Sequence, residues 1–454
     1  MTIRLPRIAA LALVVALVAP GSRASHAAVR VPKLQYETYK LGNGLTVILS
    51  EDHSTPIVHV QLTYHVGSKN ERPGRTGFAH LFEHMMFKGS KNVEPEMHTS
   101  LIASVGGQSN AYTSDDETVF WQTVPAQFLP LVLWLEADRM ATLRIDQGTF
   151  LNEREVVKEE RRMRIDNQPY GRLTEIIYEN AFTVHPYKHP TIGSMADLEA
   201  ASIDDVRDFY ATFYVPSNCT ITIVGDFDPA QARQLVDQYL ARVPGSDRPV
   251  PRDIPQEPPQ TRERRLTIET PWPLPAVVVA HHITYDGHPD SYPLHIASKV
   301  LSDGQSSRIY QKLVYDRQLA VAAFGGANLI EHPNLFYAVA IVQPGQAPED
   351  AIAALIGELD RLKAEPISDR DLQRTKNQFT RDYILGRESN QQKASQLAHA
   401  SVLHADIRTA DGEIDIFQGI TAADVQRVAQ TYFRPENRLV LTLMPASRPG
   451  GRAR

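Results

Sequence analysis

Apolar residues recur at helical spacing around position 80 of this chain. They fall within one short stretch: Phe78, Leu81, Phe82, Met85, Met86 and Phe87. Because residues three and four apart share one face of an α-helix, this pattern predicts a helix that lies largely inside the protein.

A second helix is predicted over residues 153–163. Its predicted stripe contains Glu153, Val156, Val157, Glu160 and Met163. Two carboxylates that share a face with two valines are oddly placed for solvent. Periodicity alone leaves open a second interpretation, in which this is a solvated helix stabilised by surface ion pairs.

The first helix carries three polar residues among its apolar ones, in the order His80, Glu83 and His84. Imidazoles four residues apart point about 40° from each other, so both can reach one metal ion. Zinc lowers the pKa of a bound water to about 7, and an adjacent carboxylate can accept the proton. A third ligand is then needed, and the second helix offers two candidates on one face, Glu153 and Glu160. The alternative is that both histidines are hydrogen-bonded residues of an ordinary helix.

The H-L-F-E-H string, followed by the E-R-x-V-V-x-E-E run that contains Glu160, resembles the inverted motif of the pitrilysin or insulinase zinc peptidases. The chain is similar to half-length, two-domain members of the mitochondrial-processing-peptidase-like type. The resemblance implies Zn²⁺ held by His80, His84 and Glu160. It also implies that Glu83 is the general base and that Glu153 is a supporting carboxylate.

The stretch from Gly106 to Asp116 is similar to the edge strand along which family members pair a peptide substrate. The resemblance therefore assigns Asn110 and Ala111 to substrate binding, and β-favouring residues follow them. Without the resemblance, the sequence favours an ordinary turn residue at Asn110, after two glycines. Further similar segments are His185-Pro186-Tyr187, Ile192-Gly193 and residues 306–310.

The N-terminus is typical of a secretory signal peptide, predicted over residues 1–27. Arg4 and Arg7 precede an apolar run over residues 8–19, and small residues follow near Ala24 and Ala27. Twelve apolar residues are too few to span a bilayer, so no stable membrane anchor is expected. We expect an exported, periplasmic protein. Cys219 is the only cysteine, which excludes an intramolecular disulfide.

Composition indicates a globular protein that does not bind nucleic acid. Hydrophobic residues make up 42% and charged residues 22%, and the formal net charge is −6. No basic stripe with interleaved aromatic residues is present. Residues 243–265 contain six prolines and predict an extended linker. It separates a zinc-binding catalytic domain, residues 28–242, from a second domain without metal, residues 266–454.

The two halves share a spaced pattern. Asp205-Val206, Thr212, Pro216 and Asn218 recur 219 residues later, from Asp424-Val425 to Asn437, and an apolar strand follows each copy. This predicts an α+β fold of two related domains, each a mainly antiparallel sheet packed with helices. The resemblance implies that together they form one half of a clamshell.

The second half departs from the family at two positions. An Arg and a Tyr, seven residues apart in relatives, are replaced here by Val314 and Val321. Valine cannot donate a hydrogen bond to a substrate carbonyl or an oxyanion. We therefore expect a heterodimer with a related chain that supplies the Arg and Tyr. The alternative is that Arg317 or Tyr315 substitutes for them.

The sequence thus predicts a zinc metalloendopeptidase that cleaves peptides or unfolded segments. The competing interpretation is a non-catalytic structural or assembly subunit of a peptidase-like complex. A third is a metal-dependent hydrolase that acts on a non-peptide amide.

Overall fold

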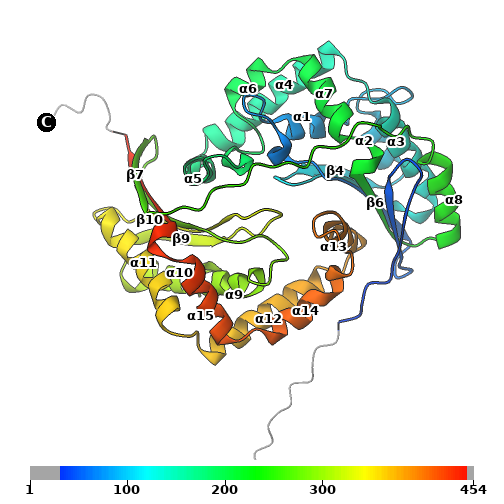
Figure 1. The fold of residues 1–454 in the computed structure, drawn as a ribbon. Coiled ribbons are helices and arrows are strands. Elements are labelled where there is room, and N and C mark those ends of the chain that lie inside the picture. The colour runs from blue at the N-terminus through cyan, green and yellow to red at the C-terminus, as the bar shows by residue number, and fades with distance from the viewer. Residues whose placement is uncertain (1–30, 447–454) are drawn as a thin grey trace, which may run out of the picture. The chain divides into compact units, whose positions relative to one another are not determined.

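Two β-sheets organise the computed structural model, which describes residues 31–446 (Figure 1). In that range one sheet has six strands in the order β1-β2-β6-β3-β5-β4, and the other has five in the order β7-β11-β8-β10-β9. The strands are β1 (Glu37–Lys40), β2 (Thr46–Glu51), β3 (Ile57–Tyr64), β4 (Gln108–Thr113), β5 (Thr118–Pro125), β6 (Cys219–Gly225), β7 (Arg264–Thr270), β8 (Ala276–His282), β9 (Ala320–Ala327), β10 (Leu335–Val342) and β11 (Arg438–Pro445). The predicted signal peptide, residues 1–27, lies outside the described residues.

Helices follow and cover these strands. The α-helices are α1 (Phe78–Met85), α2 (Met97–Ser104), α3 (Leu129–Thr142), α4 (Gln147–Arg161), α5 (Leu173–Ala181), α6 (Met195–Ala200), α7 (Ile203–Phe213), α8 (Pro229–Tyr239), α9 (Ser291–Ser302), α10 (Arg308–Tyr310), α11 (Pro348–Ala364), α12 (Asp369–Leu385), α13 (Asn390–Val402), α14 (Thr409–Gly419) and α15 (Ala422–Tyr432). Two π-helical turns are η3 (Arg162–Asp166) and η6 (Gln311–Asp316), and the 3₁₀ turns are η1 (Ser68–Asn70), η2 (Ala126–Phe128), η4 (Pro186–Lys188), η5 (Pro216–Asn218) and η7 (Pro435–Asn437).

The two sheets share one topology. In the first, β2 pairs parallel with β6, and the remaining pairs from β6 through β3 and β5 to β4 are antiparallel. The second repeats this, with β7 parallel to β11 and antiparallel pairs through β8 and β10 to β9. The expectation of two related, mainly antiparallel sheets packed with helices is confirmed. Strand β1 is an addition to the first sheet.

The predicted repeat has a structural basis in two equivalent asparagines. Asn218 and Asn437 are each the last residue of a Pro-containing 3₁₀ turn and directly precede the strand that pairs parallel with its neighbour. Each side-chain amide donates to two backbone carbonyl oxygens, which belong to His65 and Phe213 in the first half and to His282 and Tyr432 in the second. The same amide thus fastens the same helix–turn–strand unit in both halves.

Each sheet receives one covering helix from the other half of the chain. Helix α5 packs through Ile176 and Ile177 in a cluster with the second sheet's Val278 and Leu441. Helix α13 packs against β3 and β6 of the first sheet, and its Leu397 joins a cluster with two residues of that sheet, Ile48 and Val224. Both faces of the central strands are therefore buried.

A buried polar network also joins the halves. The Lys69 Nζ lies 2.9 Å from Asp116 Oδ1 and also pairs with Glu331, which follows β9 in the second half. Tyr187 donates to the same Asp116 oxygen at 2.6 Å, and the His65 Nε2 lies 2.8 Å from Glu331. The charges of this network are paired, as burial requires.

The segment between Tyr239 and Arg264 contains neither a helix nor a strand. In residues 31–446, none of the helices combines the length and the apolarity that a membrane crossing needs.

Candidate metal centre

Helix α1 is the predicted buried helix. Phe78, Leu81, Phe82 and Met85 are at most 2% exposed, so its apolar face is part of the first sheet's core. The buried carboxylate of Glu71 holds its N-terminus by accepting from the backbone N–H groups of residues 77 and 79, each at 2.8 Å. A negative charge is favourable at a helix N-terminus, which fixes the start of this helix.

Helix α4 begins at an N-cap, Asp146, and buries Phe150, Glu153 and Val157. The predicted stripe was wrong at two positions, because Val156 is 43% exposed and Met163 is 58% exposed. One residue along a helix turns the side chain by about 100°, so Val156 points away when Val157 points inward. Met163 lies in the π-helical turn η3, where the helical register changes.

The two helices bring three candidate ligands together. The Glu160 Oε2 lies 3.2 Å from His84 Nε2 and 3.8 Å from His80 Nε2. The two imidazole rings are 4.9 Å apart between centroids. All three ligand atoms lie within 4.8 Å of one another. Two imidazole nitrogens and one carboxylate oxygen are a donor set typical of a catalytic zinc site.

Glu83 and Glu153 take different positions beside this cluster. Glu83 Oε2 accepts a hydrogen bond from the Thr113 hydroxyl at 2.8 Å, and burial raises the pKa of the Glu83 carboxyl. Glu153 is 1% exposed, and its Oε2 lies 3.8 Å from His84 Nδ1, on the far side of the ring from Glu160. Its other oxygen lies 3.3 Å from Lys88 Nζ. Glu153 is thus placed to orient the His84 ring.

The environment of His80 suits a neutral ligand. Burial, together with the neighbouring His84, lowers the pKa of His80 to about 4. Its Nδ1 is buried and has no hydrogen-bond partner among the described residues. A neutral imidazole keeps a lone pair for a metal ion, so the residues present fit Zn²⁺.

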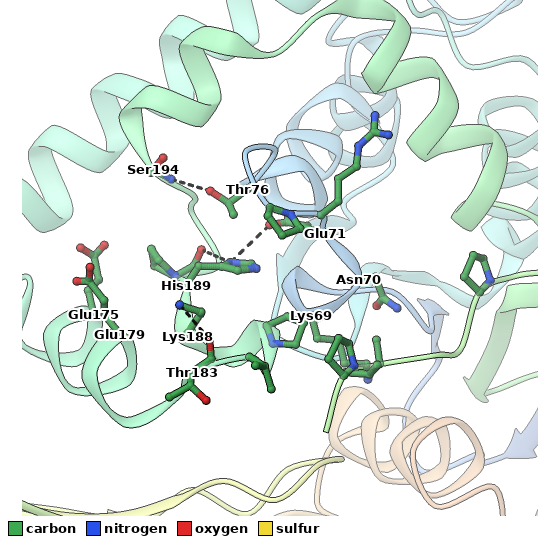
Figure 2. Close-up of a pocket in the computed structure, with 18 of the residues that line it drawn as sticks. Lys69, Asn70, Glu71, Thr76, Glu175, Glu179, Thr183, Lys188, His189 and Ser194 are labelled. Atoms are coloured by element: carbon green, nitrogen blue, oxygen red, sulfur yellow. Dashed lines mark hydrogen bonds and ion pairs between the residues drawn. The ribbon is translucent and has the colours of Figure 1, made fainter. Parts of the chain in front are cut away.

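Two neighbouring cavities are both lined by His189. One of about 430 Å³ is lined by His80, Glu160 and Thr113 and also by Asn328 of the second half. The other, of about 780 Å³, contains none of the candidate ligands (Figure 2). The His189 ring nitrogen lies 3.7 Å from Glu71 in the larger one. The smaller cavity is the one that gives access to the cluster.

Comparison with known proteins identifies the family. The family model described as Insulinase (Peptidase family M16) matches residues 46–195, and the model described as Peptidase M16 inactive domain matches residues 200–379. The zinc protease PqqE of Helicobacter pylori is 30% identical over 423 residues, which cover 92% of this chain and 95% of that protein. The chain belongs to the insulinase family, M16.

Solved structures of this family share the fold. The crystal structure of a protease from Helicobacter pylori superposes with a TM-score of 0.87 at 29% identity, covering 91% of this chain and 100% of that one. The periplasmic protease PqqL from Escherichia coli has a TM-score of 0.73 at 19% identity. It covers 91% of this chain, but this chain covers only 48% of PqqL. The chain therefore spans about half the length of PqqL.

The edge strand that the resemblance predicted is β4, which within residues 31–446 has β5 on one side and no strand on the other. Asn110 is exposed, and its side-chain oxygen accepts from the Ala111 N–H at 2.9 Å. The strand ends at Thr113, the residue that contacts Glu83. An extended segment on β4 would thus run toward the cluster.

The two departures from the M16 pattern lie on the second sheet and beside it. Val314 is partly buried against the second core, and Val321 is 44% exposed on the edge strand β9. Arg317 is exposed, as is Tyr315, whose ring packs 5.5 Å from that of Tyr310. Neither substitute residue lines the cavity that contains His80 and Glu160.

Sequence reasoning missed three contacts of the M16 site. Glu71 anchors α1, Thr113 holds Glu83, and the Arg164 guanidinium lies 2.5 Å from Glu160 Oε1. The Arg164 contact has the i, i+4 spacing of helical ion pairs and could have been predicted from it. The contacts of Glu71 and Thr113 depend on how distant segments meet.

Proposed function

We propose that this chain is a zinc-dependent endopeptidase that cleaves peptides or unfolded segments. The observation that carries the proposal is the convergence of His80, His84 and Glu160, with Glu83 on the helix that carries both histidines. Two findings support it. All four residues lie in the region that matches the peptidase model, outside the region that matches the inactive domain. A relative of nearly equal length is named a zinc protease.

The proposed chemistry divides between the metal and the chain. Zn²⁺ would supply Lewis acidity, which lowers the pKa of water so that it can lose a proton and attack a peptide carbonyl near neutral pH. Thr113 holds one oxygen of Glu83, and the other can accept the proton as general base. Glu153 keeps the His84 ring in its orientation. Asn110 and Ala111 present backbone groups on β4, so an extended substrate can pair there with little demand on its sequence.

The same proposal includes a partner. Val314 and Val321 cannot donate to a developing oxyanion, so we propose a heterodimer in which a related chain supplies the Arg and Tyr. The exposed Tyr315, Val321 and Phe324, on or beside β9, offer an apolar surface for such a contact. PqqL, at about twice this length, supports a two-half arrangement for the fold. A non-catalytic assembly subunit is the competing function, and the missing donors are the observation that favours it.

We further propose the export signal and the domain boundaries that the sequence predicts. Residues 1–27 are a signal peptide that exports the protein to the periplasm. Residues 28–242 form the zinc-binding domain, 243–265 the linker and 266–454 the second domain.

Replacing Glu83 by glutamine tests the function. Cleavage of an unfolded protein is measured for the full chain with its co-purified partner, and zinc is measured by mass spectrometry. Loss of a general base lowers the rate by roughly 10²- to 10⁴-fold, and zinc should be retained. Glu159→Gln, an exposed carboxylate next to Glu160, is the control and should keep full activity.

Cleavage by Glu83→Gln at the parent rate contradicts the peptidase proposal. Full activity of the wild-type chain purified alone contradicts the need for a partner and leaves the zinc site intact.

A further inference from the structure

A second cluster of potential metal ligands lies away from the M16 site. Asp286 follows β8, His399 lies on α13, and His404 lies in the turn before α14. The Asp286 Oδ2 is 2.9 Å from His399 Nε2 and 2.8 Å from His404 Nε2. In the described range, this and the His80 cluster are the groups of three His, Cys, Asp or Glu residues whose ligand atoms lie within 4.8 Å of one another.

The hydrogen bonds of His404 point to a cation in this cluster. The Thr409 hydroxyl donates its single proton to the Asp406 carbonyl at 2.8 Å. Its oxygen lies 2.9 Å from His404 Nδ1, so it accepts there and Nδ1 carries the hydrogen. The Nε2 of a neutral ring then presents a lone pair to the Asp286 oxygen. Two lone pairs at 2.8 Å repel each other, and a proton or a metal ion has to compensate.

The surroundings favour a metal ion over a proton alone. A cavity of about 280 Å³ adjoins the cluster and is lined by His399, His404 and Glu413. Glu413 makes no hydrogen bond or ion pair in the described part of the chain. A carboxylate without a partner beside two imidazoles and an aspartate is available as a further ligand.

We propose that Asp286, His399 and His404 bind a divalent transition metal ion of the zinc class, with Glu413 at the open side. Nitrogen and oxygen ligands bind zinc at about 2.0–2.2 Å, which separates tetrahedral ligands by roughly 3.3 Å. The present contacts have to widen by about 0.4–0.5 Å, which small side-chain rotations supply.

The position of this ion gives it a structural role. Helix α13 packs on the first sheet through Ala394 and Leu397, whereas Asp286 extends from the second sheet. The cavity also contains Tyr112 of β4 and Glu117, which accepts the Tyr112 hydroxyl at 2.8 Å. A metal ion here links α13, α14 and the loop after β8, and thereby stabilises the contact between the two halves near the edge strand.

Zinc stoichiometry tests this site independently of the peptidase site. The full chain is stripped with a chelator, titrated with Zn²⁺ and measured by native mass spectrometry. The double variant His80→Ala/His84→Ala retains the second cluster and should bind one equivalent. The wild type should bind two, His404→Ala one, and the combination of all three substitutions none. His53→Ala is the control, since His53 pairs with Asp226 at 2.6 Å without a second imidazole, and it should still bind two.

The outcomes separate the two sites. If the M16 site fails to bind zinc but this inference holds, the wild type and the double variant each bind one equivalent. If the double variant binds none, the cluster holds only a proton and the inference is overturned.

Thermal unfolding provides a readout that does not depend on the His404→Ala variant folding. Zn²⁺ should raise the Tm of His80→Ala/His84→Ala and leave it unchanged when His404→Gln, which keeps a polar side chain, is added. An equal rise in both chains also overturns the inference.

Discussion

Replacing Glu153 by glutamine tests how far one buried carboxylate controls the zinc affinity of His84. Glutamine keeps the size of the side chain and removes its charge. Glu153 is 1% exposed, and its carboxylate lies 3.8 Å from His84 Nδ1 and 3.3 Å from Lys88 Nζ. Lys88 keeps a second partner, Glu96, so the substitution leaves no isolated buried charge there.

The expected magnitude follows from this geometry. Two full charges 4 Å apart interact by about 4 kcal/mol at an effective dielectric of 20, which is an upper bound because a zinc-bound imidazole carries only part of a charge. Removal of a carboxylate behind a metal-bound histidine costs roughly 10- to 100-fold in metal affinity, or about 1.4–2.7 kcal/mol. We expect Glu153→Gln to fall in this range with its fold retained.

The assay is a Zn²⁺ titration in competition with a chelator of known affinity. It is performed in the His404→Ala background, so that the measured affinity is that of the His80–His84–Glu160 site alone. Glu155→Gln on the same helix is the matched control, because Glu155 is 55% exposed and its partner Lys158 keeps a second carboxylate, Glu199, at 3.2 Å. It should change the affinity less than about twofold. An affinity of Glu153→Gln within twofold of the parent would refute the orienting role.

Three further experiments test the fold that holds the site. Burial alone would raise the pKa of Asp52, but hydrogen bonds from Lys393 and Ser54 lower it to about 2. The ionised carboxylate therefore stabilises the folded chain above pH 4, and this stabilisation is lost as the pH falls toward 2. Asp52→Asn should flatten that part of a urea-unfolding pH profile, by about 2 kcal/mol, and an unchanged profile would contradict the pairing with α13. Asn218→Ala and Asn437→Ala each remove the amide donor of two backbone carbonyls. In the first half the His65 carbonyl keeps a bond from Arg252, but Arg252 loses its own bond to the Asn218 side chain. Both substitutions should therefore destabilise the chain by a similar amount, about 2–3 kcal/mol in denaturant unfolding, and a loss at one position alone would argue against equivalent roles. Gly193→Ala should lower the Tm of the metal-free chain more than Gly345→Ala. Both glycines have a positive φ, but a Cβ at Gly193 would lie 2.5 Å from the Thr76 carbonyl oxygen, whereas a Cβ at Gly345 would meet open space. Equal losses would show that only backbone strain matters.

The metal cluster was predictable because local patterns mark both of its helices. Apolar neighbours placed His80 and His84 on a buried helix, and spacing placed Glu153 and Glu160 on one face of another. The same spacing failed for Val156 and Met163, because it ignores which side of the helix meets the core and does not foresee a π-helical turn. Periodicity locates a helix better than it orients one.

The contacts that complete the site were not predictable from local patterns. Thr113 reaches Glu83 from an edge strand that lies 30 residues along the chain. Asp286 meets His399 across 113 residues, and His399 and His404 are five apart, which is not the spacing of helical neighbours. Such pairs are set by the packing of the sheets.

Helix α5 of the first half covers the second sheet, and helix α13 of the second half covers the first sheet. This reciprocal packing explains why the second half is retained although it lacks the metal motif. In the first half, β6 is buried along its whole length, and α13 provides the cover for Ile48 and Val224 on one side of the sheet. The second sheet depends in the same way on α5, which follows the helix that carries Glu160. Neither half buries its own sheet alone, so the position of the zinc-site helices depends on contacts with the second half. The second copy therefore contributes packing to the site even though Val314 and Val321 cannot contribute hydrogen-bond donors.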